Sequence, residues 1–182
     1  GVMIQGGAVA QVMAALEDTR LSQGSQLPEQ WTGYAERIRM HFAEQSPGEA
    51  KLRVIATTPA NINMMRLDLN ASGLARRNLW LTDAYFMPTR LYVQALINAA
   101  KAGVDVRLLV PRTSDIKWIG TVSRTQYRHL LEAGVRIFEW NGTMIHAKSA
   151  LADGTWARVG STNLNLSSWY ANRELDVSIE DA

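Results

Sequence analysis

The chain has no cysteine, which excludes a disulfide-stapled fold and any thiolate nucleophile or metal ligand. It has only three histidines, so imidazole chemistry is confined to very few positions. No run of about 18 or more apolar residues occurs, so no stretch has the pattern of a membrane-spanning helix. The formal net charge is only +2, which by itself gives no ground for expecting a nucleic-acid partner.

The composition that remains is typical of a globular domain, with 47% apolar and 20% charged residues. A chain of 182 residues can bury one substantial core but is too short for two large domains. The first residues, GVMIQGGAVAQVMAAL, lack a cationic leader, so a signal peptide is not predicted. The sequence begins without methionine and ends directly after a predicted strand. We therefore expect a fragment of a longer protein.

Hydrophobic periodicity divides the chain into three parts. Apolar residues at helical spacing predict an amphipathic helix over 8–19, within a first segment 1–20. Residues 21–50 are interpreted as a linker, because the stretches LSQGSQLPEQ and SPGEA interrupt them, although 30–45 has a helical pattern. From residue 51 to 182 the pattern is regular and predicts one domain.

Strand and helix patterns alternate within this last part. The order strand, helix, strand over 79–110 indicates a βαβ unit, whose helix is bounded by a capping Thr89 and a terminal Gly103. The sum predicts an α/β fold with a mixed, largely parallel sheet of about seven strands and helices on both faces. Strands are expected at 51–59, 78–86, 104–111, 135–140, 143–152, 156–161 and 174–181, and helices at 61–77, 89–103, 121–134 and 163–171.

Two dipeptides predict tight turns near the end of the chain. Asn141-Gly142 is the strongest hairpin signal and predicts that strands 135–140 and 143–152 pair. Asp153-Gly154 predicts a second turn, into strand 156–161.

The strand between these turns carries an unusual polar pair. His146 and Lys148 are two residues apart, so on a strand they point to the same face. A buried ammonium group needs an anion or a water-filled cleft beside it. The next strand ends in Ser161 and Asn163, after Gly160, which permits a close approach. A cation, a hydroxyl and an amide suit a phosphate group, and an imidazole can attack phosphorus or protonate a leaving oxygen.

Each of these pieces alone has an ordinary structural interpretation. A single histidine on a strand is usually a satisfied structural residue, Asp-Gly is usually only a turn, and Gly-Ser-x-Asn is common in loops. Their order on neighbouring strands favours the functional interpretation.

One set of residues carries a family resemblance, in this order along the chain: His146, Lys148, Asp153, Gly160, Ser161 and Asn163. Their spacing resembles the HKD motif of the phospholipase D superfamily. The resemblance covers about residues 51–182, including LTDAYFMPTRLYVQALINAAKAGVDVRLLVP, YRHLLEAGVRIFEW and NRELDVSIED. Within the superfamily, the chain looks most similar to bacterial cardiolipin synthases and related phosphatidyltransferases. The stretch GGAVAQVMAAL then resembles the helix that closes the first repeat of those two-repeat enzymes.

The resemblance implies a catalytic triplet of His146, Lys148 and Asp153. His146 would be one of two catalytic histidines, of which one forms a phosphohistidine and the other acts as general acid and then base; His146 would be the general acid. Lys148 and Asn163 would bind the phosphoryl oxygens, with Ser161 nearby. Asp153 would be a structural carboxylate that holds the hairpin.

Other matched positions would support the site. Glu174 would orient His146 by accepting its other ring N–H, the usual partner role for an imidazole. Tyr85 and Asp115 follow matching strand ends and resemble pocket positions of the family. Trp118 also follows a strand end and could touch lipid, although packing on its own domain is an equal alternative. No cofactor and no metal is implied, because lysines supply the positive charge.

The family needs two such motifs in one active site, and this chain has one. His41 and His129 have no lysine two residues on, and we expect both to be structural or exposed to solvent. The second motif is expected in a missing N-terminal repeat or on a second subunit.

The resemblance implies phosphatidyl transfer through a phosphohistidine, with cardiolipin synthesis from phosphatidylglycerol as the expected reaction. The partners would be phospholipid and the membrane surface, with the enzyme peripheral to the bacterial inner membrane on its cytoplasmic face. The alternatives are a phospholipase, another phosphodiesterase or a nuclease of the superfamily, or a half that is inactive without its partner repeat. Single-motif nucleases are dimers and more basic, so a nucleic-acid partner is not expected here.

Overall fold

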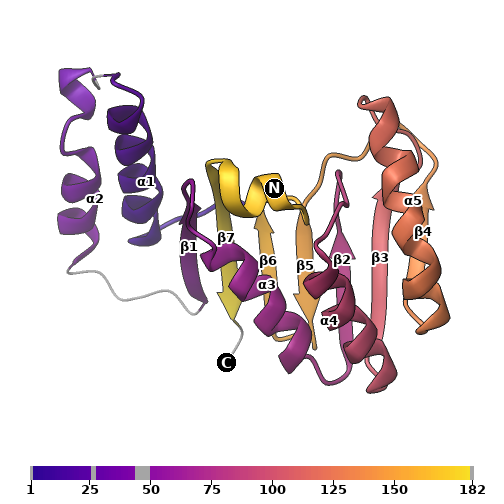
Figure 1. Ribbon diagram of the computed structural model, residues 1–182. Coiled ribbons are helices and arrows are strands. Elements are labelled where there is room, and N and C mark those ends of the chain that lie inside the picture. The colour runs from indigo at the N-terminus through magenta and orange to yellow at the C-terminus, as the bar shows by residue number, and fades with distance from the viewer. Residues whose placement is uncertain (1, 26–27, 44–49, 181–182) are drawn as a thin grey trace.

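The computed structural model describes residues 2–25, 28–43 and 50–180, and its centre is one seven-stranded sheet (Figure 1). The strands lie in the order β1-β7-β6-β5-β2-β3-β4. Their bounds are β1 Lys51–Thr57, β2 Asn78–Thr82, β3 Asp105–Pro111, β4 Arg136–Trp140, β5 Ser149–Ala152, β6 Trp156–Gly160 and β7 Glu174–Glu180. The helices are α1 Ala8–Ser22, η1 Glu29–Trp31, α2 Tyr34–Ala43, α3 Asn63–Leu74, α4 Arg90–Lys101, α5 Lys117–Glu132 and the short η2 Ser167–Ala171.

The sheet is mixed, as predicted, but it is not largely parallel. Only the pairs β2–β3 and β3–β4 are parallel, whereas β1–β7, β7–β6, β6–β5 and β5–β2 are antiparallel. Parallel neighbours require a crossover, which α4 and α5 provide. The antiparallel pair β5–β6 is joined by the short loop at Asp153, whose φ of 57° is the left-handed conformation that the predicted turn requires.

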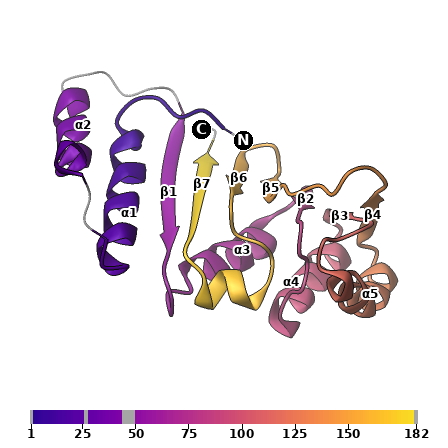
Figure 2. The same ribbon diagram turned by 90° about the horizontal axis from the view of Figure 1, so that it is seen from above.

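The helices α3, α4 and α5 lie on one face of the sheet, as the view from above shows (Figure 2). The expectation was helices on both faces. Each of the crossovers β1-α3-β2, β2-α4-β3 and β3-α5-β4 moves across the sheet in the same direction. Because such crossovers are right-handed, all three helices must cover the same face. The helix α1 lies beside the edge strand β1 instead, next to α2 (Figures 1 and 2).

The predicted hairpin at Asn141-Gly142 is wrong. The strand β4 forms one edge of the sheet, and β3 and β2 separate it from β5. The chain therefore leaves β4 along the edge of the sheet and enters β5 at Ser149, six residues later than the expected start of the strand at 143. A Cβ on Gly142 would lie 2.7 Å from Nε1 of Trp140, so this glycine serves a close approach to the indole rather than a strand turn.

The segment interpreted as a linker contains structure of its own. The helix α2 lies within it and runs beside α1 (Figure 1), whereas residues 44–49 of the linker lie outside the described residues. In the described ranges, no helix has the length and apolarity that crossing a bilayer requires.

The core lies between the sheet and α3, α4 and α5. The cap predicted for α4 is present, since the Thr89 side chain accepts a hydrogen bond from the Tyr92 backbone N–H (3.3 Å). Strands β2 and β3 alternate buried and more exposed residues, and Leu79, Leu81 and Leu108 face the helices with at most 3% exposure. Both strands run from this core toward the edge of the sheet at which its polar residues gather.

One buried cation ties α3 to the sheet. The Arg158 side chain is fully buried, and its Nε lies 3.3 Å from Oδ1 of Asp68 on α3. Its Nη1 lies 3.2 Å from Oδ1 of Asp176 on β7, and donates to the backbone oxygen of Thr162 (3.1 Å). The ionic cluster lies directly beneath the segment that follows β6.

Candidate active site

The polar residues of the motif gather at one edge of the sheet, with one exception. The register pairs Thr82 of β2 with Ser149 of β5, and Gly160 of β6 with Asp176 of β7. The ends of β2 and β6 and the starts of β5 and β7 therefore lie together, at the upper edge in Figure 1. Residues from Asp83 to Tyr85, Lys148, Ser161 and Glu174 lie at this edge.

His146 and Lys148 precede β5 rather than lying on it, which corrects the prediction of a strand over 143–152. The Lys148 backbone oxygen still accepts a hydrogen bond from the Gly160 N–H (3.2 Å). His146 is exposed and Lys148 is only 5% exposed, so their environments differ although they are two residues apart. The Lys148 ammonium donates a hydrogen bond to the His146 backbone oxygen (2.8 Å).

Tyr85 brings the histidine and the lysine together. Its ring lies edge-to-face with the His146 imidazole at 5.6 Å between centroids, and the Lys148 ammonium lies 5.7 Å from the same ring centroid. The Tyr85 hydroxyl donates to Asp115 (2.8 Å to Oδ1), so these two pocket positions are joined. That hydrogen bond holds the pKa of Asp115 below its usual value. The tyrosine thus forms one wall of the candidate site.

The charge on Lys148 is influenced by burial and by two carboxylates. Burial lowers the pKa of the Lys148 ammonium, and the charges of Asp83 and Glu174 oppose this effect. A half-desolvated ammonium at the edge of a sheet is a strong ligand for an anion, because water competes weakly for it.

Glu174 is held by hydroxyl and amide groups. Its Oε2 accepts from the Ser161 hydroxyl (2.6 Å), and its Oε1 accepts from Ser168 (2.8 Å) and from the Asn172 amide (3.1 Å). Between the described residues, no hydrogen bond joins Glu174 to His146, so the expected orienting contact is absent. The Ser161 hydroxyl is bonded to this carboxylate, and its oxygen accepts from the Leu175 N–H (3.0 Å).

Asn163 is half-buried beside this network. Its Nδ2 donates to the Ser168 hydroxyl (3.4 Å), while its Oδ1 is buried and has no hydrogen-bond partner among the described groups. A buried acceptor of this kind costs about 1–3 kcal/mol if nothing binds it. Only a donor can satisfy this oxygen, so a phosphoryl oxygen at this place would be bound by the Asn163 Nδ2 instead.

Gly160 makes room for the buried ionic cluster below these residues. A Cβ at this position would lie 2.1 Å from Oδ1 of Asp176, a distance that real contacts do not reach. The glycine is therefore required by the close approach of β6 to the Asp176 carboxylate, and through it the position of Ser161 is set.

Asp153 does not lie with His146 and Lys148, and its contacts fit the structural carboxylate of the hairpin that the resemblance implies. It follows the opposite end of β5, about 13 Å or more from the start of that four-residue strand. Its carboxylate accepts hydrogen bonds from the backbone N–H groups of Arg76 (2.8 Å), Arg77 (2.7 Å) and Asn78 (3.0 Å). This carboxylate fastens the β5–β6 loop to the start of β2.

Replacing Asp153 with alanine should therefore lower stability rather than catalysis. Three backbone donors lose their acceptor, and a non-glycine residue without a polar side chain must hold a φ of 57°. We expect a loss of about 2 kcal/mol in the free energy of unfolding by urea. Asp153→Asn keeps an acceptor and tolerates this φ, so it should lose less. Equal losses for both variants would contradict this role.

Trp118 lies in the first turn of α5 and is 58% exposed. Its side chain therefore lies largely at the surface of the described chain, and contact with lipid stays a prediction. Three further residues of the site, Asp83, Ser168 and Asn172, were not predicted. Asp83 lay inside the expected strand 78–86, so no spacing singled it out.

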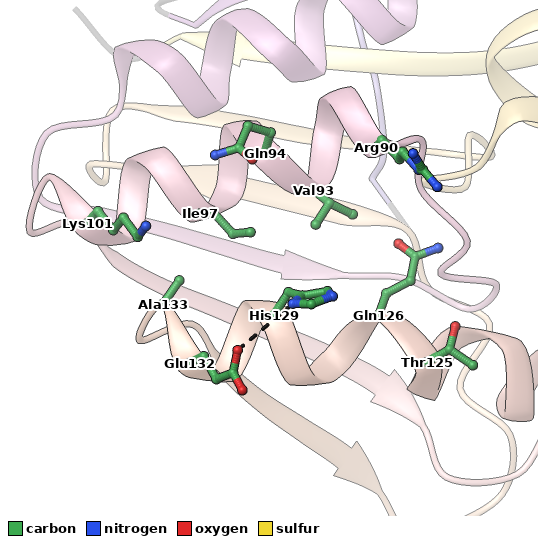
Figure 3. A pocket seen from close by; sticks show the side chains of 10 residues that line it. All are labelled: Arg90, Val93, Gln94, Ile97, Lys101, Thr125, Gln126, His129, Glu132 and Ala133. Carbon is green, nitrogen blue, oxygen red and sulfur yellow. Dashed lines mark ion pairs between the residues drawn. The ribbon is translucent and has the colours of Figure 1, made fainter.

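A groove of about 720 Å³ lies between α4 and α5, on the helical layer and separate from this edge (Figure 3). His129 lies in this groove with 72% of its side chain exposed, and its Nδ1 is 3.9 Å from Oε2 of Glu132. It is therefore exposed to solvent, as expected. The lining residues are Arg90, Val93, Gln94, Ile97, Lys101, Thr125, Gln126, His129, Glu132 and Ala133.

Comparison with known proteins identifies relatives of this fold and the family of the chain. The topology is that of phospholipase D-type domains: it superimposes on Nuc from Salmonella typhimurium, a phospholipase D family member, with a TM-score of 0.62 and 22% identity over 73% of this chain and 84% of that one. Phosphatidylserine synthase from Haemophilus influenzae gives a TM-score of 0.57 and 16% identity over 86% and 43%. These likenesses concern the fold alone.

The sequence comparison is more specific. The model of the family described as "Cardiolipin synthase, PLD-like domain" matches residues 70–182, and the chain belongs to this family. Cardiolipin synthase A from Klebsiella pneumoniae is 39% identical over 114 residues, which are 63% of this chain and 24% of that protein. The Escherichia coli protein of the same name is 39% identical over 113 residues. The chain spans about a quarter of the length of these curated relatives.

Proposed function

We propose that this chain supplies one half of the active site of a phosphatidyltransferase that makes cardiolipin from phosphatidylglycerol. The observation that carries the proposal is the edge of the sheet that holds His146, Lys148 and Asn163. An exposed imidazole and a largely buried ammonium lie there against the Tyr85 ring, and the Asn163 amide, whose Nδ2 can donate to a phosphoryl oxygen, follows β6 at the same edge. The identity of about 39% to cardiolipin synthase A supports the choice of lipid substrate.

The proposed chemistry has two steps and uses a histidine from a second motif as nucleophile. In the first, that histidine attacks phosphorus, a P–N bond forms, and the P–O bond to glycerol breaks while His146 gives a proton to the departing oxygen. In the second, the hydroxyl of another phosphatidylglycerol gives its proton to His146 and attacks phosphorus, and the P–N bond breaks. Lys148 and Asn163 hold the phosphoryl oxygens throughout.

The second motif comes from an upstream repeat or from a second subunit. The resemblance of the first residues to a closing helix of a preceding repeat supports the upstream position. We place the enzyme peripherally at the cytoplasmic face of the bacterial inner membrane, where its phospholipid substrate is. The exposed Trp118 is proposed to contact lipid, because indoles favour the membrane interface.

The proposal is tested with the complete protein that contains this segment, supplied with phosphatidylglycerol in mixed micelles. The expected products are cardiolipin and glycerol in equal amounts. Parallel reactions offer water alone as acceptor, and single-stranded DNA as substrate. Cleavage of DNA without formation of cardiolipin would overturn the proposal in favour of a nuclease, and release of phosphatidic acid alone would favour a phospholipase.

A further inference from the structure

Asp83 is a fully buried carboxylate that follows β2 at the site edge. Its Oδ1 accepts a hydrogen bond from the Tyr85 N–H (2.8 Å), and its Oδ2 accepts one from the Leu164 N–H (2.6 Å). Its own backbone N–H donates to the Leu109 oxygen of β3 (3.0 Å). One side chain thus joins the end of β2 to the segment after β6.

Further hydrogen bonds join the same two segments, the one after β2 and the one after β6. The Met87 N–H donates to the Leu164 oxygen, and the Asn165 amide donates to the Tyr85 oxygen, both at 3.1 Å. Asn163 directly precedes Leu164, and Tyr85 is the ring that touches His146. The Asp83 carboxylate therefore connects the segment that contains Asn163 with the segment that contains Tyr85, and so fixes Asn163 relative to the Tyr85 ring.

Asp83 also faces the lysine of the motif. The antiparallel register pairs Thr82 with Ser149, so the next step along both chains puts Asp83 opposite Lys148. The charged groups that face Lys148 are Asp83 and Glu174, and those that face Asp83 are Lys148 and Arg158. Arg158 is already paired with Asp68 and Asp176.

The environment of Asp83 makes its charge depend on these partners. Burial raises the pKa of its carboxyl group to about 7, and the N–H groups of Leu164 and Tyr85 and the two cations oppose the rise. The carboxyl group is therefore about half ionised at pH 7, and it becomes a full carboxylate as the pH rises above its pKa.

We infer that Asp83 is a positioning residue of this site, which fixes Asn163 through Leu164 and supplies the buried negative charge that keeps Lys148 protonated. The inference deepens the proposed function, because it takes Lys148 and Asn163 as the phosphoryl-binding groups. Asp83 itself touches no reacting atom.

The first test needs no activity and uses the 182-residue chain labelled with ¹³C at lysine Cε. The chain has four lysines, so the Lys148 signal can be assigned by substitution. Removing a facing anion favours the neutral amine, so Asp83→Asn should move the Lys148 titration to lower pH. The matched control is Asp105→Asn, which removes a partly exposed carboxylate at the other end of the neighbouring strand and should leave Lys148 unchanged.

The second test follows phosphatidyl transfer by the complete protein as a function of pH. Asp83→Asn should reduce kcat/KM by about 10–100-fold through misplacement of Asn163. The loss of activity at alkaline pH should also begin at lower pH than in the wild type, because Lys148 deprotonates earlier. If Asp83 were purely structural, its replacement would lower the folded fraction but would not change the pH at which activity is lost on the alkaline side. If Asp83→Asn does not fold, Asp83→Ser keeps a short acceptor without the charge and is read in the same way.

The two tests separate the inference from the function on which it rests. A wild-type protein that transfers no phosphatidyl group would remove the proposed function, and the Lys148 titration would still decide whether Asp83 sets its charge. A folded Asp83→Asn chain in which Lys148 titrates as in the wild type overturns the inference.

Discussion

Replacing His146 with alanine should reduce kcat for phosphatidyl transfer by about 10²–10⁴-fold, the range that a general acid–base group contributes. The leaving glycerol oxygen would then depart without a proton, and the acceptor hydroxyl would lose its base. His146 is exposed, and the group of this residue that Lys148 binds is its backbone oxygen, which alanine retains. The fold and the position of the lysine should therefore persist.

The measurement is kcat and KM with phosphatidylglycerol, together with the midpoint of thermal unfolding. His129→Ala is the matched control, because its imidazole is 72% exposed and lies in the groove between α4 and α5. It should keep wild-type kcat. A His146→Ala enzyme with kcat within a factor of about three of the wild type would remove this residue from the proton transfers.

Replacing Arg158 with methionine should lower the free energy of unfolding by about 3–5 kcal/mol, because it leaves buried carboxylates without their cation. Asp68 and Asp176 have side-chain exposures of 1% and 0%, so water cannot replace the guanidinium. Arg107→Met is the control. Arg107 pairs with Asp105 at 2.8 Å with 39% of its side chain exposed, and such surface pairs contribute at most about 1 kcal/mol.

The loss in Arg158→Met should depend on pH. Burial already raises the pKa of Asp68 from 3.8 to about 6 with the arginine present, and removing that cation raises it further. Between pH 3.8 and the raised pKa of Asp68, the folded protein binds more protons than the unfolded chain. The free energy of unfolding therefore rises as the pH falls through this range. Urea unfolding at pH 5 and at pH 7.5 should show the smaller deficit at pH 5. An equal deficit at both pH values would contradict the ionic account.

The fold was predictable where local signals and long-range pairing agree. Apolar alternation located β2 and β3, and Thr89 marked the start of α4. Asp153-Gly154 gave a true turn because both neighbours of that turn pair with each other. Asn141-Gly142 has the same local chemistry, but the crossover through α5 places β4 next to β3 and away from β5. A dipeptide contains no information about that choice.

In the candidate site, too, local features could be predicted and features that depend on strand pairing could not. The spacing of His146, Lys148 and Asn163 identified the edge of the sheet, because a motif is a local pattern. The bond from Ser161 to Glu174 and the hydrogen bonds of Asp83 depend on which strands become neighbours, and no residue spacing reveals this. Arg158 on a strand would ordinarily be taken as a surface residue, and only the packing of α3 shows that it is buried.

The central claim is that His146 belongs to the reacting half of a phosphatidyl-transfer site. The most direct measurement uses phosphatidylglycerol labelled with ³²P, rapid quenching, and the complete protein with and without His146→Ala. The account predicts cardiolipin and an acid-labile, alkali-stable label on the wild-type protein, and turnover reduced by about 10²–10⁴-fold in the variant. Labelling and turnover that both survive in His146→Ala would contradict it.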